Sequence, residues 1–370
     1  MHKIRGLYEK IYDFGNLYEA YIQARKGKRY RLEVMKFTNH LEENLIQIQN
    51  ELMWKTYEVG RYREFFVNEP KKRLIMALPF MDRVVQWAIY QVLNPYFEKG
   101  FIADSFACRV GKGTHRAVDR LQYWLRYMHR RHEQFFALKL DVSKYFYRVD
   151  HNVLMGILRR RVGDEDLLWL LEVIVRCEHT KFGIPLGDHQ FDADRIGGVG
   201  MPIGNLTSQM FANLYLNELD QYAKQTLHAK RYIRYMDDVV VLHEDKKYLW
   251  ALKEQIDEFI TSQLNLKLNN KTMVRKASQG VEFVGFRVWP THKKLRKKSA
   301  LKMKRRLRYL QRAFGRGAVD LQEVNSSVQS YLGILKHCNS YNLREKLFGN
   351  LVWTRDSAHQ SQEEILYSHD

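Results

Sequence analysis

The sequence predicts an α+β fold for this chain of 370 residues. Helical periodicity dominates both ends, and short apolar runs of strand length appear in the middle. Hydrophobic residues make up 45% of the chain and aromatic residues 13%, so burial can offset the entropy that the chain loses on folding. We therefore expect a globular chain with two or three subdomains that share a core.

The first part is predicted to be helical, because apolar residues recur at helical spacing between residues 3 and 58. The runs REFFV and RLIMAL then flank an Asn-Glu-Pro turn signal and predict a β-hairpin. A helix should follow over DRVVQWAIYQVL, and another over residues 115–131.

The middle of the chain alternates strands and helices. FFALKLDV, YIRYMDDVVVL and EFVGFRVW are apolar runs of strand length, and the second carries an Asp-Asp pair at its middle. Helices are expected over residues 151–176 and 205–226, with a Gly-rich polar insertion over 182–200.

From about residue 296 the chain is helical and very basic. The stretch from Lys293 to Arg316 contains no acidic residue, whereas Leu301, Leu307 and Phe314 supply an apolar side. The basic side is either an ordinary solvated face or a flank that meets phosphates.

The net charge of +19 and the pI of 9.6 favour a polyanionic partner, nucleic acid first and a membrane surface second. The N-terminus has no apolar signal region, and no run of about 18 apolar residues occurs, so we expect a cytoplasmic protein with no membrane partner. Cys108, Cys177 and Cys338 are widely spaced and are expected to be reduced structural thiols.

Acidic residues in apolar surroundings carry the chemistry. Asp237 and Asp238 lie within an apolar run, where two adjacent carboxylates are costly to bury unless cations or hydrogen bonds compensate them. Asp141 lies at the end of another apolar strand, and antiparallel pairing could bring it about 5 Å from Asp237 at the backbone. An Asp-Asp turn at the surface is the alternative interpretation.

Three converging carboxylates could hold two Mg²⁺ ions about 4 Å apart, with Mn²⁺ as a substitute. One ion would lower the pKa of an attacking hydroxyl, and the other would stabilise the oxygen that leaves a phosphate. Phosphoryl transfer is the reaction class that this arrangement favours.

LDVSKYF and YMDD resemble the two catalytic motifs of reverse transcriptases, in the order found in that family. The resemblance implies a right-hand polymerase with fingers, palm and a short helical thumb, acting as an RNA-directed DNA polymerase. It implies that Asp141, Asp237 and Asp238 are catalytic metal ligands, that the Val142 carbonyl touches a metal, and that Tyr235 and Met236 contact nucleic acid.

Further motifs imply nucleotide contacts. Lys71 and Arg73 resemble the first fingers motif, in which the arginine pairs with triphosphate oxygens, although a basic surface hairpin would look the same. Phe146 stands where the family carries an aromatic gate against a 2′-hydroxyl, although a core role is an alternative. Lys271 is a candidate cation beside the departing pyrophosphate.

Contacts to the template and primer are implied farther along the chain. Gly285, in FVGF, could let the primer backbone approach closely. The basic helix matches the position of the thumb, where Lys302, Arg305 and Arg306 would grip phosphates.

The resemblance also implies boundaries along the chain. We expect a helical N-terminal extension over 1–60, fingers over 61–134, a palm over 135–295 with a fingers insertion near 155–200, and a thumb over 296–370. We expect the chain to end soon after the thumb, with no maturase, HNH nuclease or RNase H domain.

The segment PIGNLTSQ narrows the resemblance to reverse transcriptases of diversity-generating retroelements, because most bacterial relatives read close to PQGGxxSP there. Ile203 replaces an amide that would hydrogen-bond near the base and sugar, and Gly204 lets the loop approach the nucleotide. Losing a contact of ~1.5 kcal/mol would relax nucleotide selection roughly tenfold.

That family implies errors opposite template adenines, a structured template-repeat RNA, a cDNA primer strand, dNTPs and a small basic accessory protein oligomer. The residues alone single out neither adenine nor a primer source. Three alternatives stay open: a retron or abortive-infection reverse transcriptase, a non-catalytic RNA-binding scaffold, and an RNA-dependent RNA polymerase, which Phe146 and the Met of YMDD disfavour.

Overall fold

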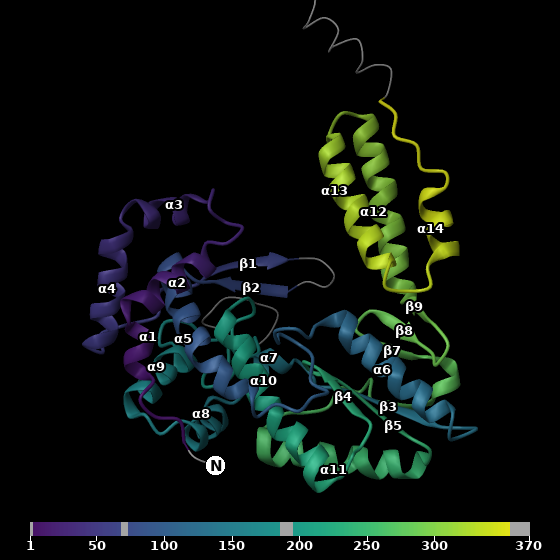
Figure 1. Ribbon diagram of the computed structural model, residues 1–370, viewed down its shortest axis with the longest axis horizontal. Coiled ribbons are helices and arrows are strands. Elements are labelled where there is room, and N and C mark those ends of the chain that lie inside the picture. Colours follow the sequence, from purple (N-terminus) through teal and green to yellow (C-terminus); the bar gives the residue numbers. More distant parts are fainter. Residues whose placement is uncertain (1–2, 68–72, 186–194, 356–370) are drawn as a thin grey trace, which may run out of the picture. The chain divides into compact units, whose positions relative to one another are not determined.

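The computed structural model describes residues 3–67, 73–185 and 195–355 and is a mixed α+β structure with antiparallel sheets (Figure 1). It contains two compact units. The first comprises Met1–Gly113, Leu138–Val241 and Trp250–Met273, and the second comprises Thr114–Ala137, Leu242–Leu249 and Val274–Asp370. The predicted α+β fold class is confirmed.

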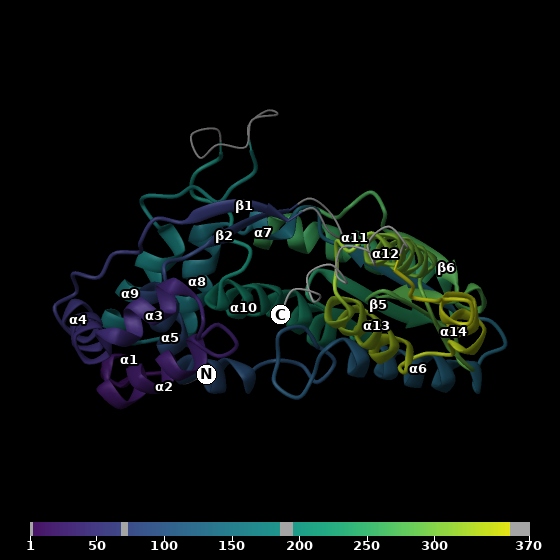
Figure 2. The same cartoon turned by 90° about the horizontal axis from the view of Figure 1, so that it is seen from above.

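Helices begin the first unit, as predicted. They are α1 (Tyr8–Tyr12), α2 (Phe14–Ala24), α3 (Leu32–Asn39) and α4 (Leu41–Met53). Asp13 starts α2 by accepting a hydrogen bond from the Asn16 amide at 3.1 Å, which satisfies one of the amides left open at a helix start. The apolar side of α2 is fully buried, and α2 packs along α5 (Figure 2).

The predicted hairpin follows, formed by β1 (Arg63–Val67) and β2 (Arg73–Ala77), with Val67 opposite Arg73. Helix α5 (Phe80–Glu98) then covers the predicted DRVVQWAIYQVL helix and begins earlier, because Pro79 sets its start. Of the second unit, α6 (Thr114–His129) matches the helix expected near 115–131.

A four-stranded sheet has the strand order β4-β5-β3-β6. Its strands are β3 (Phe136–Asp141), β4 (Tyr232–Tyr235), β5 (Asp238–His243) and β6 (Met273–Lys276). The run YIRYMDDVVVL is therefore not one strand with Asp-Asp at its middle. It is an antiparallel hairpin in which Tyr235 lies opposite Asp238, so that Met236 and Asp237 form the turn.

Helices connect these strands. They are α7 (Tyr145–Arg148), α8 (His151–Arg161), α9 (Glu165–Arg176), α10 (Leu206–Gln221) with a π-helical turn, η2 (Tyr222–Thr226), and α11 (Lys246–Leu264). Asp150 and Asp164 begin α8 and α9 by accepting backbone N–H bonds, so the helical stretch expected over 151–176 consists of two helices. Helix α10 is buried on most sides and supplies the centre of the unit.

The second unit carries a three-stranded antiparallel sheet and a helical end. Its further elements are η3 (Ala277–Gln279), β7 (Val281–Phe283), β8 (Phe286–Val288), β9 (Lys293–Leu295), α12 (Lys297–Gly315), α13 (Leu321–Leu335) and α14 (Tyr341–Phe348). The run EFVGFRVW is thus a hairpin with Val284 and Gly285 in its turn, and the prediction of one strand is wrong.

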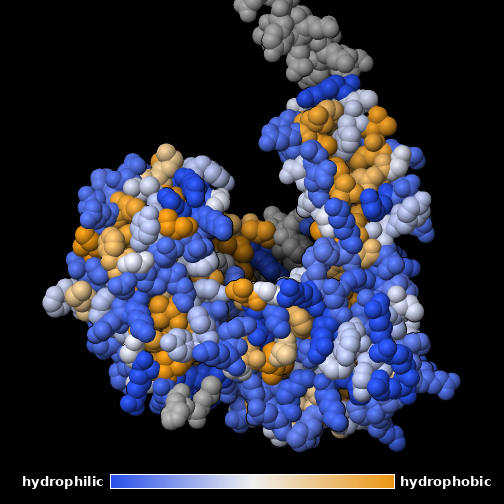
Figure 3. All heavy atoms as spheres, in the orientation of Figure 1, coloured by the Kyte–Doolittle hydropathy of each residue, from blue (hydrophilic) through white to orange (hydrophobic). Residues whose placement is uncertain are grey.

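Helix α12 has the expected apolar side, because Met303, Leu307, Leu310 and Phe314 are buried. Met303 and Leu307 form a small core with Leu335 of α13 and Leu347 of α14. Hydrophobic side chains also reach the surface of these three helices (Figure 3), and Leu301, expected on the buried side, is 47% exposed.

Among the described residues, none of the helices combines the length and apolar character that crossing a bilayer requires. The three cysteines are free thiols: Cys177 is buried, Cys338 is half-buried and Cys108 is exposed. The expectation of unpaired cysteines is confirmed, and only Cys177 has the burial expected of a core thiol.

Candidate active site

The β4–β5 hairpin presents Asp237 and Asp238 at its tip. Met236 occupies the first turn position with φ of 53°, a left-handed conformation that is uncommon outside glycine. Asp237 follows it in the turn, and Asp238 begins β5. A two-residue turn with positive φ at its first position suits the twist of a hairpin, so the two carboxylates are consecutive at a fixed corner.

Asp238 carries a buried carboxylate oxygen that lacks a partner. Its Oδ2 accepts a hydrogen bond from the Lys139 ammonium at 3.2 Å, whereas its Oδ1 is buried and meets no hydrogen-bond donor among the residues that the structure describes. Burial raises the pKa of the Asp238 carboxyl to about 6; Lys139 lowers it, and the carboxylates of Asp237 and Asp141 raise it further. The three predicted acids therefore act on one another electrostatically.

Asp141 ends β3 and is held by the loop that precedes β6. Its Oδ2 accepts a hydrogen bond from the Asn269 side-chain amide at 3.0 Å, and its carbonyl accepts one from the Asn269 backbone N–H at 2.7 Å. Val142 pairs with Leu268 in an isolated antiparallel bridge. These bonds fix both the backbone and the side chain of Asp141.

The negative charge and the oxygen atoms of the three acids suit a cation, but these acids do not form a complete metal site. Within residues 3–67, 73–185 and 195–355, no three acidic, histidine or cysteine side chains meet the geometry of a complete metal site. The fit rests on Asp238, whose Oδ1 is buried and has no hydrogen-bond partner among the described residues, although Lys139 pairs with its Oδ2. Oxygen ligands of this kind are those that Mg²⁺ prefers.

The loop before α10 is anchored to α7 and β2. The Met201 amide donates to the Phe146 carbonyl at 2.7 Å, and the Met76 amide of β2 donates to the Ile203 carbonyl at 3.3 Å. Gly204 has φ of +121°, and a Cβ there would lie 3.4 Å from Ile75. The structure therefore brings Phe146, Ile203 and Gly204 together with the strand that carries Arg73.

The half-buried Tyr62 and the buried Gln86 fix the end of this loop. The Asn205 side chain donates to the Tyr62 hydroxyl at 2.8 Å, and the Leu206 amide donates to the Gln86 side-chain oxygen at 3.2 Å. Burial raises the pKa of Tyr62 well above its usual range, so its hydroxyl stays neutral and available as an acceptor. Sequence reasoning did not identify Tyr62 or Gln86.

The remaining residues predicted to bind the nucleotide are Arg73, Lys71 and Lys271. Arg73 is exposed at the start of β2, whereas Lys71 lies outside the described residues. Lys271 is exposed, and its amide donates to the Asn269 side-chain oxygen at 3.2 Å, which places it on the loop that holds Asp141.

In the second unit, Gly285 belongs to the β7–β8 turn with φ of +85° and open space where a Cβ would be, so it is not inside a strand as predicted. On α12, Arg305 is exposed and Arg306 pairs with Glu323 of α13 at 3.0 Å. Lys302 is half-buried on the same helix.

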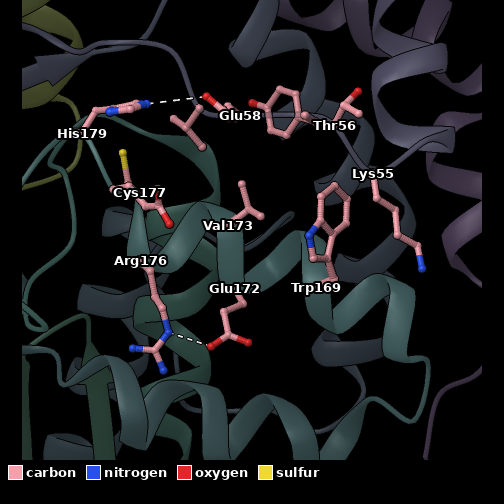
Figure 4. Close-up of a pocket in the computed structure, with 12 residues that line it drawn as sticks. Lys55, Thr56, Glu58, Trp169, Glu172, Val173, Arg176, Cys177 and His179 are labelled. Atoms are coloured by element: carbon pink, nitrogen blue, oxygen red, sulfur yellow. Dashed lines mark hydrogen bonds and ion pairs between the residues drawn. The ribbon is translucent and has the colours of Figure 1, made fainter.

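A cavity of about 360 Å³ lies apart from these acids, between the segment Lys55–Val59 and the end of α9 (Figure 4). Its lining contains none of the predicted site residues. Arg176 pairs with Glu172 at 2.7 Å, and His179 lies 3.7 Å from Glu58. These two pairs occupy four of the charged or titratable side chains on its wall, and Lys55 pairs with Asp166 outside it.

Comparison with known proteins identifies relatives. Residues 68–288 match the family model of reverse transcriptase (RNA-dependent DNA polymerase). Protein YkfC of Escherichia coli is 25% identical over 276 residues, which cover 65% of this chain and 70% of that protein. The group II intron-encoded protein LtrA of Lactococcus lactis is 21% identical over 315 residues, 66% of this chain and 49% of LtrA.

A putative COX1/OXI3 intron 2 protein of Saccharomyces cerevisiae is 21% identical over 280 residues, 62% of this chain. The chain thus spans 31% of the yeast protein and about half of LtrA. The matched region contains both the Asp141 strand and the hairpin with Asp237 and Asp238.

Proposed function

The chain belongs to the reverse transcriptase family of RNA-dependent DNA polymerases, and on this premise we propose that it copies a template-repeat RNA into error-prone cDNA for targeted sequence diversification. In the proposed reaction, the 3′-hydroxyl of a primer attacks the α-phosphate of a dNTP. A new P–O bond forms, and pyrophosphate leaves.

The observation that carries this proposal is the half-satisfied carboxylate at the hairpin tip, because Lys139 pairs with only one of its two oxygens. Oδ1 of Asp238 is buried without a partner, in the field of Asp237 and Asp141. A protein gains nothing in stability from such a group, because burial penalises its charged form. A role in binding cations would explain why a carboxylate occupies this position.

Asp141, Asp237 and Asp238 would hold divalent cations, with Mg²⁺ as the expected ion, and the Val142 carbonyl would be a further ligand. When bound, Mg²⁺ supplies Lewis acidity that activates the primer hydroxyl and stabilises charge on the leaving phosphates. Lys139 limits the repulsion among the carboxylates before the ions arrive, because it pairs with Asp238. Asn269 orients Asp141 through its side-chain amide.

The nucleotide would bind between the anchored loop and β2. Arg73 would pair with triphosphate oxygens, and Lys271 would meet the departing pyrophosphate. The Phe146 ring would exclude a 2′-hydroxyl by steric overlap. Ile203 presents an aliphatic side chain that offers no hydrogen bond to the base or sugar, which supports relaxed nucleotide selection.

The segment PIGNLTSQ supports the diversity-generating class, in which errors concentrate at template adenines. Template RNA, a primer strand and a small basic accessory protein oligomer are the partners proposed for that class. A retron or abortive-infection enzyme is the second candidate, because it would share the three acids and differ in its template.

Primer extension on an RNA template with Mg²⁺ and dNTPs, followed by sequencing of the cDNA, tests the proposal. We expect synthesis by the wild type, none by Asp237→Asn, and an excess of errors at template adenines. Ile203→Gln restores an amide and is expected to lower the error frequency. Ile196→Gln, at an exposed residue, is the matched control and should leave the error frequency unchanged.

The other outcomes assign the chain elsewhere. Accurate cDNA from the wild type would keep the polymerase and move it to the retron or intron relatives. No synthesis by the wild type, even with candidate accessory protein and cognate RNA present, would favour a non-catalytic RNA-binding scaffold.

A further inference from the structure

The residue that precedes the YMDD turn carries a fully buried positive charge. The Arg234 side chain has no exposed surface, and neither does its partner Asp220 of α10. The guanidinium donates to both carboxylate oxygens, at 2.7 Å from Nε and 2.6 Å from Nη2. Tyr232 of the same strand also donates its hydroxyl to Asp220, at 2.7 Å.

The other donors of Arg234 reach the turn and its surroundings. Nη1 donates to the Met236 carbonyl at 3.0 Å, and Nη2 donates to the Ser105 hydroxyl at 3.1 Å. Met236 is the residue with φ of 53°, and its carbonyl carbon forms the peptide bond to Asp237. One planar group therefore links a helix, a loop and the strained peptide of the hairpin tip.

The stability of the fold does not explain the buried pair of Arg234 and Asp220. A buried ion pair recovers little or no net free energy compared with apolar side chains of similar volume, because both ions must be desolvated. A left-handed non-glycine residue is strained and persists only where its surroundings enforce it. The bond from Arg234 to the Met236 carbonyl supplies that enforcement, and the Asp220 pair fixes the guanidinium.

We propose that Arg234, held by Asp220, is a positioning residue that sets the orientation of the peptide between Met236 and Asp237 and thereby the direction of both carboxylates at the hairpin tip. The inference rests on the proposed function, in which Asp237 and Asp238 together hold the divalent cations. Because its side chain has no exposed surface, Arg234 would act through the turn and not by contact with substrate or cation.

Arg234→Lys is the first test. Lysine keeps the charge beside Asp220 but has a single nitrogen, which cannot bond Asp220, Ser105 and the Met236 carbonyl in the fork geometry of arginine. We expect kcat for primer extension to fall by about ten- to a hundredfold. The Mg²⁺ concentration that gives half-maximal activity should rise, and the KM for the template–primer should stay unchanged.

Arg161→Lys is the matched control. Arg161 pairs with Glu218 of the same helix α10 at 3.3 Å, and its side chain is 13% exposed, so the exchange breaks an arginine–carboxylate pair away from the turn. Its kcat and Mg²⁺ dependence should equal those of the wild type. A purely structural role for Arg234 would lower thermal stability without changing the Mg²⁺ dependence.

A double variant, Arg234→Met with Asp220→Leu, removes both charges and leaves neither one stranded. We expect it to fold, as judged by circular dichroism and thermal denaturation, and to keep the low kcat. If either folded variant retains wild-type kcat and Mg²⁺ dependence, the positioning role is wrong, even though Asp237→Asn is inactive. If the wild type makes no cDNA at all, the proposed function fails first.

Discussion

Replacing Asp238 by Asn is expected to stabilise the metal-free protein while it abolishes DNA synthesis. The wild-type carboxylate has one buried oxygen without a partner and lies in the field of two other acids. An amide of nearly the same shape removes the charge, so the folded state no longer pays for burying it. It also removes the acid that the proposed reaction requires.

The magnitude follows from the pKa of Asp238. Raising the pKa of this carboxyl from 3.8 to about 6 corresponds to about 3 kcal/mol in favour of the protonated form. The side chain keeps 24% of its surface exposed, and solvent screening there reduces the effect. We expect the Asp238→Asn variant to gain about 2 kcal/mol at pH 7.5.

The sign of the pH dependence is fixed by the raised pKa. The folded protein holds the Asp238 proton more tightly than the unfolded chain does, so the associated stability is fully present below about pH 4. It is lost as the pH rises through about 6. The advantage of the variant over the wild type should therefore be largest above pH 7 and fall by roughly half at pH 5.

Thermal denaturation of both proteins in EDTA, at pH 5.0 and pH 7.5, measures this difference, because the two chains differ in sequence only at this titratable group. Glu254→Gln, at an exposed carboxylate whose side chain is 70% exposed, is the control and should shift Tm little at either pH. A variant that is less stable than the wild type at pH 7.5, or an advantage that does not depend on pH, would refute the reasoning.

Three further substitutions test other contacts. Asn269→Ala removes the 3.0 Å bond to Asp141, so kcat should fall by about five- to tenfold with the KM for the template–primer unchanged, as steady-state kinetics would measure. Tyr62→Phe leaves the Asn205 side chain without its acceptor, which should cost about 1–3 kcal/mol in thermal denaturation and alter the misincorporation frequency in sequenced cDNA. Arg73→Ala should raise the KM for dNTP by about tenfold, in nucleotide titrations, without weakening template–primer binding. For each of the three variants, a measured value equal to that of the wild type would contradict the assigned contact.

Periodicity and turn signals predicted much of the fold. The Asn-Glu-Pro signal gave the β1–β2 hairpin its correct partners, and the apolar run that ends at Asp141 is strand β3. The hairpin at Met236 was one of two interpretations of its run, a strand or a hairpin, because no Gly, Asn or Pro marks its turn. There the tertiary bond from buried Arg234 replaces a local signal. The β7–β8 turn is marked by Gly285, but this residue was interpreted as a glycine inside a strand.

The site was predictable where a residue's type and spacing carry its chemistry. Lys139 lies two positions before Asp141, on the same side of the strand, so its place near the acids could have been inferred from the period of two. Asn269 lies far from Asp141 in the sequence, and only loop geometry joins them. The same holds for Tyr62, whose contact with Asn205 depends on how the loop before α10 packs against the segment before β1.

Single-turnover incorporation of one dNTP into a primer paired with an RNA template tests the central claim most directly. The wild type should extend the primer when Mg²⁺ is present. Asp141→Asn, Asp237→Asn and Asp238→Asn should each be slower by at least about a hundredfold, while binding the template–primer as the wild type does. Three folded variants that incorporate the nucleotide at the wild-type rate would contradict the account, because the carboxylates at the hairpin tip and at the end of β3 would then have no part in the reaction.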